Sequence, residues 1–169
     1  MMVEEYRKKA YKIAAENGFL EEEYSDKFWL TMIISELFEA IDADRNNRRA
    51  NWLFYIQSGE KGVPLKTRYD VYISGTLEDE LADACIRIFT YAEATGRTAK
   101  FCRVKLNESQ NIPEYVYDIM KSLTHGGSLT YALSRINSLC EKKGIDIDWF
   151  IRQKMNYNEL REYKHGKKY

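Results

Sequence analysis

FWLTMIISELFEAIDA, residues 28–43, is a strongly apolar stretch that carries two carboxylates on or beside its packing side. At about 100° per residue, Glu36 shares a helix face with Trp29 and Ile33, and Glu39 follows almost one turn later. An unpaired buried carboxylate costs several kcal/mol and therefore needs a partner or a metal. The stretch predicts a core helix that presents two glutamates from its packed side.

A second stretch repeats this pattern. LEDELADACIRIFTYAEAT, residues 77–95, is apolar around most of a helix and carries Glu80 and Asp83, again three apart. Four carboxylates on two helices would repel one another and raise their pKa values, and a divalent cation relieves that repulsion. Ligand sets made only of oxygen favour Mg²⁺ over zinc. The two stretches together predict a four-carboxylate metal site made of Glu36, Glu39, Glu80 and Asp83.

The same spacing has an alternative interpretation. Glu80, Asp83 and Arg87 follow the three-to-four-residue period of a solvated helix face. Asp83 and Arg87, four residues apart, could form an ordinary surface ion pair. On spacing alone, both interpretations stay open.

The composition favours one soluble, helical domain spanning residues 1–169. Apolar residues make up 44% of the 169 residues and charged residues 31%, with only two prolines and nine glycines. The formal net charge of zero gives no general attraction to nucleic acid or to an anionic membrane. Neither a signal peptide nor an apolar run of membrane-spanning length is present, and the three cysteines are widely spaced, so we expect a cytoplasmic protein.

Apolar periodicity and capping residues predict the remaining helices. We expect them over residues 2–16 and 112–123, between Ser128 and Gly144, and after Asp146 or Asp148. The fold class is therefore all-α, a bundle of about four core helices.

Residues 46–75 read as a long, irregular inserted loop between the two acidic helices. Residues 48–56 allow a short helix within it, and residues 69–73 allow a short strand. Its arginines and aromatic residues could stack a base, but such residues more often fix a long loop or fill a subunit contact.

The C-terminal region carries a basic and polar face. Lys154, Asn158 and Arg161 lie at positions i, i+4 and i+7 of the last helix, and a basic tail, residues 164–169, follows with Lys164. Arginine forks and lysine point charges bind phosphate oxygens. A solvated face with a frayed tail is the alternative.

These motifs together resemble one known family. Glu36-Leu-Phe-Glu39, then ELADACIRIFTYAEATG at 80–96 and KMNYNELREYKHGKKY at 154–169, are similar to the MazG-like branch of the all-α nucleoside triphosphate pyrophosphohydrolases, relatives of dimeric dUTPases. The resemblance covers roughly residues 25–45, 76–96 and 145–168, in the family's order. Two departures stand out: the gap between the acidic motifs is longer, and Ser35 replaces a common glutamate.

The resemblance implies Mg²⁺-dependent hydrolysis (Mn²⁺ may substitute) of a nucleoside triphosphate to the monophosphate and pyrophosphate by a homodimer or homotetramer. Glu36, Glu39, Glu80 and Asp83 would hold the metal, with Lys154, Asn158, Arg161 and Lys164 on the phosphates. Trp29, Trp52 or Tyr55 would contact the base.

Two other classes of protein are alternatives to a nucleotide hydrolase. A catalytically silent helical adaptor on the same fold is the alternative. A ferritin-like di-metal oxidase needs a Glu-x-x-His motif on each of two bundle helices, and the sequence has this spacing only once, at Glu162 and His165.

Overall fold

The computed structural model describes residues 3–104, 109–126 and 128–163, which form helices and contain no strand. The all-α prediction is confirmed. In chain order the helices are α1 (Val3–Glu16), α2 (Asp26–Arg45), α3 (Trp52–Glu60), α4 (Leu65–Tyr72), α5 (Leu77–Thr95), α6 (Ile112–Thr124), α7 (Leu129–Lys143) and α8 (Ile147–Asn158).

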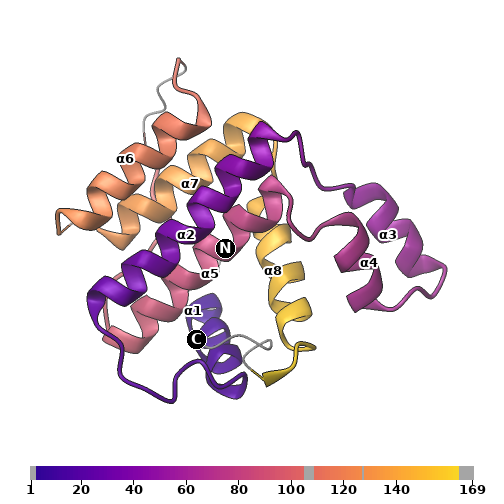
Figure 1. Cartoon of the computed structure of the whole chain (residues 1–169), viewed down its shortest axis with the longest axis horizontal. Coiled ribbons are helices and arrows are strands. Elements are labelled where there is room, and N and C mark those ends of the chain that lie inside the picture. Colours follow the sequence, from indigo (N-terminus) through magenta and orange to yellow (C-terminus); the bar gives the residue numbers. More distant parts are fainter. Residues whose placement is uncertain (1–2, 105–108, 127, 164–169) are drawn as a thin grey trace.

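Helix α5 lies at the centre of the molecule and contacts α1, α2, α7 and α8 (Figure 1). It is buried around most of its circumference, because its apolar residues face several neighbours at once. Helix α2 crosses α5 with Ile33 and Leu37 fully buried, as the sequence periodicity predicts. The pair α6 and α7 covers another side of the bundle (Figure 1).

Helix ends follow the predicted capping chemistry. The side chains of Ser25, Thr76, Ser128 and Asp146 each accept a hydrogen bond from a backbone N–H in the first turn of α2, α5, α7 and α8. Unpaired N–H groups at a helix start are satisfied in this way. Of the two caps that the sequence left open for the last helix, Asp146 rather than Asp148 caps α8.

The prediction of an irregular loop over residues 46–75 was wrong, because this segment contains the helical hairpin α3–α4 (Figure 1). The short helix that the sequence allowed over residues 48–56 forms in part, as α3. The short strand that the sequence allowed over residues 69–73 does not form, because α4 covers residues 65–72. Tyr69 and Ile73 are buried, whereas Val71 between them is 65% exposed. A spacing of four places Tyr69 and Ile73 on one face as the helix closes, while a strand would also have turned Val71 inward.

The hairpin packs against the bundle through aromatic side chains. Tyr69 of α4 stacks on Tyr157 of α8 with ring centroids 4.3 Å apart, and the Tyr55 hydroxyl of α3 donates to Gln153. Arg49, just before α3, donates to Glu78 of α5 at 2.6 Å. The inserted segment is therefore an ordered part of the fold that borders the start of α5.

No helix within the described residues has the length and apolar character needed to cross a membrane.

Candidate metal and ligand cleft

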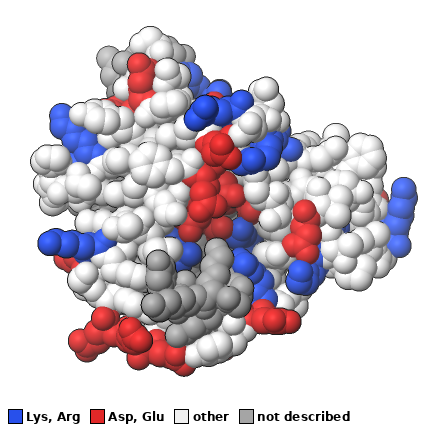
Figure 2. All heavy atoms as spheres, in the orientation of Figure 1, with Lys and Arg blue, Asp and Glu red and all other residues white. Residues whose placement is uncertain are grey.

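The crossing of α2 and α5 brings three of the four predicted carboxylates together. Oxygen atoms of Glu36, Glu80 and Asp83 all lie within 4.8 Å of one another. Glu39, the fourth, is exposed and lines the same cleft outside this group. Acidic side chains gather in the middle of the face shown in Figure 2, over α2 and α5. The predicted cluster is thus present, with three members close and one at its edge.

The cluster opens into a cleft of about 480 Å³ between α1, α2, α5 and the C-terminal end of α8. Lys154, Asn158 and Arg161 line this cleft together with the carboxylates and Trp29. Lys164 lies outside the described residues. The cleft therefore contains all four predicted carboxylates and three of the four predicted phosphate-binding residues.

Two cations from the cleft wall pair with the carboxylates. Arg87 Nε donates to Glu36 Oε1 at 3.0 Å, and Lys154 Nζ donates to Asp83 Oδ2 at 2.7 Å and to Asp79 Oδ1 at 2.8 Å. These pairs join α5 to α2 and to α8, so a solvated α5 face with a local Asp83–Arg87 pair does not describe this helix. Arg87 and Asp79 are the two charged residues of the cleft lining that were not predicted from the sequence.

Burial and like charge raise the pKa of two glutamates. Burial of the carboxylate, which is the largest cause, and repulsion from Asp83, which is the second, raise the pKa of Glu36 to about 7. The positive charge of Arg87 opposes this shift. Loss of water, then repulsion from Asp83 and Asp79, raises the pKa of Glu80 to about 8. The raised pKa values mean that both carboxyl groups bind a proton more tightly than an exposed glutamate does, and a bound cation would compete with that proton.

Lys154 is 4% exposed and carries its charge inside the protein. Burial acts to lower the pKa of its ammonium, but Asp83 and Asp79 outweigh this effect and raise the pKa overall. Lys154 is therefore protonated at neutral pH and lies between two carboxylates rather than extending freely into solvent.

Asp79 has more contacts than a helix-capping position requires. The Thr76 side chain does accept from the Asp79 N–H, but the Asp79 carboxylate accepts from the Gly75 N–H, Tyr69 and Lys154. A signal was available in the sequence, because an aspartate on the first turn of an apolar helix, next to a predicted ligand, also needs a partner.

The remaining predicted polar residues lie near the end of α8. Asn158 ends the helix, and its Oδ1 is buried without a hydrogen-bond partner among the described residues. Arg161 lies beyond the helix, with its guanidinium 5.6 Å from the Tyr157 ring centroid. The predicted helical face is therefore shorter than expected, although all three residues still line one cleft.

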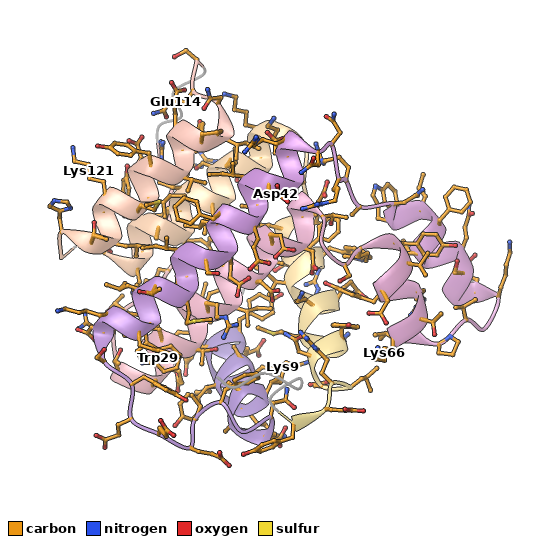
Figure 3. All side chains as sticks on the ribbon, viewed as in Figure 1. Lys9, Trp29, Asp42, Lys66, Glu114 and Lys121 are labelled. Carbon is orange, nitrogen blue, oxygen red and sulfur yellow. The ribbon has the colours of Figure 1, made fainter. Side chains whose placement is uncertain are left out.

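Aromatic side chains form another part of the cleft wall. Trp29 lies near the beginning of α2 (Figure 3) and stacks on Tyr91 of α5, with ring centroids 5.8 Å apart. Tyr24 and Phe28 stack on each other beside it. Trp52 and Tyr55 belong to the α3–α4 hairpin and are not among the cleft residues. Of the three predicted base contacts, only Trp29 is in the cleft.

The carboxylate cluster fits a hard divalent cation. Mg²⁺ takes oxygen ligands at about 2.1 Å, so ligands on opposite sides of the ion are about 4.2 Å apart. The 4.8 Å spread of Glu36, Glu80 and Asp83 is slightly wider and could close by small side-chain rotations. No sulfur or imidazole is part of this group, which disfavours zinc.

Comparison with protein-family models, with curated proteins and with solved structures gave no match to this chain.

Proposed function

We propose that the protein hydrolyses a nucleoside or deoxynucleoside triphosphate to the monophosphate and pyrophosphate, with Mg²⁺ as the metal and Mn²⁺ as a possible substitute. One observation supports this most directly. A single cleft contains a three-carboxylate cluster on α2 and α5, cationic and amide groups at the end of α8, and an aromatic wall. A metal–triphosphate ligand with an attached base requires these three kinds of surface.

Each group has a role in this proposal. Glu36, Glu80 and Asp83, with Glu39 at the edge, would hold Mg²⁺. When bound, Mg²⁺ would neutralise phosphate charge and lower the pKa of a coordinated water. Arg161 and Asn158 would donate to phosphate oxygens of the leaving pyrophosphate, together with Lys154. Trp29 would contact the base with its ring.

The MazG-like resemblance of the three motifs agrees with this assignment and makes nucleotide-pool house-cleaning the proposed role. The resemblance rests on the motifs alone.

A catalytically silent adaptor is the second candidate, and one observation favours it. Arg87 and Lys154 already pair with Glu36 and Asp83, so internal cations partly neutralise the cluster. In an adaptor these pairs would persist in the presence of Mg²⁺ and nucleotide. In the hydrolase the metal would compete with them for the carboxylates.

A substrate panel distinguishes the two candidates. Purified protein is incubated with each canonical and several modified (deoxy)nucleoside triphosphates plus Mg²⁺, and pyrophosphate is measured separately from orthophosphate. The hydrolase should release pyrophosphate and stop when the metal is chelated. Absence of turnover across the panel, with helicity intact by circular dichroism, would support the adaptor.

A further inference from the structure

Asp79 lies one residue before Glu80 on α5, but its carboxylate already accepts three hydrogen bonds from the protein. Oδ1 accepts from the Tyr69 hydroxyl at 2.6 Å and from Lys154 Nζ at 2.8 Å, and Oδ2 accepts from the Gly75 N–H at 3.0 Å. The residue is 1% exposed. A ligand that displaced these donors would leave buried polar groups without their acceptor, which is costly.

Asp83 is the other acceptor of Lys154 and differs in each of these respects. It lies one turn further along α5, its side chain is 20% exposed, and it belongs to the cluster that faces the cleft. Lys154 Nζ donates to it at 2.7 Å. A cation or a phosphate in the cleft can therefore compete for this contact without breaking the buried network around Asp79.

We infer that Asp79 is a positioning residue that holds Lys154 permanently, so that Asp83 is the exchangeable partner of the same ammonium. When Asp83 turns to a ligand in the cleft, Asp79 still neutralises Lys154. Lys154 can then donate to a ligand oxygen without leaving its place. Without Asp79, Asp83 would be the only carboxylate paired with Lys154 among the described residues, and the ammonium would compete with a metal for that carboxylate.

The α3–α4 hairpin shields the Asp79–Lys154 ion pair from water. Tyr69 of α4 donates to Asp79 and stacks on Tyr157, and the Lys154 ammonium lies 5.6 Å and 5.8 Å from the centroids of these two rings. Because water is excluded, the ion pair is stronger than a surface pair. The hairpin thus contributes to the site through Tyr69, although its exposed aromatic residues lie elsewhere.

The first test needs neither metal nor nucleotide and measures the ammonium directly. In ¹⁵N-labelled protein, a buried and hydrogen-bonded Lys154 should give a slowly exchanging ammonium signal, identified by its loss in Lys154→Met. The signal should stay slowly exchanging in Asp83→Asn and should exchange faster in Asp79→Asn, where the partner that remains is the more exposed Asp83, with backbone amide spectra showing that each variant is folded. Absence of the signal in the wild type, its loss in folded Asp83→Asn or equally slow exchange in Asp79→Asn would each overturn the inference. The Asp83→Asn result decides the matter if Asp79→Asn does not fold.

The second test measures binding of Mn²⁺ alone by electron paramagnetic resonance. Asp79→Asn should weaken binding by about tenfold or more, because Lys154 then competes for Asp83. Glu78→Gln is the matched control, since it removes one buried charge from the neighbouring residue, whose partner is Arg49. It should weaken binding less than about threefold. In a Lys154→Met background, the effect of Asp79→Asn should fall to the level of this control.

An equal effect of Asp79→Asn in both backgrounds would show that Asp79 acts only as a charge and would overturn the inference. The inference depends on the proposed function in one respect only, namely that the ligand which Asp83 contacts in place of Lys154 is a metal ion. If wild-type protein binds no Mn²⁺, the proposed metal chemistry fails, while the ammonium measurement still decides the role of Asp79.

Discussion

At the scale of single residues, the site consists of carboxylates that the fold buries together with their counter-charges. The sequence predicted Glu36, Glu80 and Asp83 because charged residues on an apolar helix face need a partner. It could not show that Arg87 pairs with Glu36 across two helices, 51 residues apart, or that Asp79 and Asp83 share Lys154. Such pairings depend on how α5 packs against α2 and α8, and local sequence periodicity does not predict the packing of one helix on another.

Glu36→Gln tests the metal site at this scale. The amide keeps the size of the side chain and an acceptor for Arg87, but it removes a buried charge. Mg²⁺ binding should weaken by about tenfold or more and nucleotide hydrolysis should be lost, whereas the melting temperature should stay the same or rise. Isothermal titration calorimetry and thermal unfolding measure these effects.

Asp42→Asn is the matched control for Glu36→Gln, because Asp42 lies on the same helix, pairs with Arg48 and is outside the cleft. Unchanged Mg²⁺ binding in Glu36→Gln would contradict the assignment.

At the scale of helices, long and strongly periodic segments were predicted correctly and the short hairpin was not. Helices α2 and α5 have caps and apolar faces that the sequence displays. Helix α4 has eight residues, begins after Pro64 and has no side-chain cap, so its local signals are weak. Its helical state depends on Tyr69, which is buried against α5 and α8 and is fixed by tertiary contacts.

A pair of neighbouring substitutions tests the phase of α2. Leu37 is fully buried against the core, whereas Phe38 is 52% exposed. Leu37→Ala should lower the free energy of unfolding by about 2–5 kcal/mol, because it removes buried methyl groups and leaves a cavity. Phe38→Ala should change it by about 0.5 kcal/mol or less in urea denaturation, unless Phe38 packs against a second subunit. Similar losses for both variants would contradict the described packing.

At the scale of the whole molecule, stability should depend on pH through the buried glutamates. The pKa values of Glu36 and Glu80 rise from 4.5 to about 7 and about 8 on folding, so the folded protein keeps protons that the unfolded chain loses. Their stabilising contribution is complete below pH 4.5 and is lost as the pH rises through the folded pKa values. This contribution to the stability of the metal-free protein should therefore decrease between about pH 5 and pH 8.

The measurement compares wild type with Glu36→Gln/Glu80→Gln by thermal unfolding across this range. The double variant should lose less stability as the pH rises. Added Mg²⁺ should stabilise the wild type more at the upper end of the range than at the lower end, because it binds deprotonated carboxylates. A wild-type profile parallel to that of the double variant would contradict the raised pKa values.

Assembly is the second prediction at this scale. We expect a homodimer or homotetramer, in keeping with the apolar surplus of the helices. Sedimentation velocity at micromolar concentration measures the mass directly, and a monomer would contradict the expectation. The exposed apolar side chains of α3, namely Trp52, Leu53 and Phe54, should be compared between wild type and serine variants in the same experiment.

The contact between Asp79 and Lys154 joins residues 75 positions apart, and this separation has a consequence for synthesis of the protein. Ribosomes add roughly 5–20 residues per second, so about 4–15 seconds pass between making Asp79 and making Lys154. During that interval α5 has no lysine to offset its buried carboxylates. The carboxylates at the start of α5 must therefore stay solvent-exposed or protonated in the nascent chain until α8 has been made. The candidate site thus forms late in the synthesis of the protein.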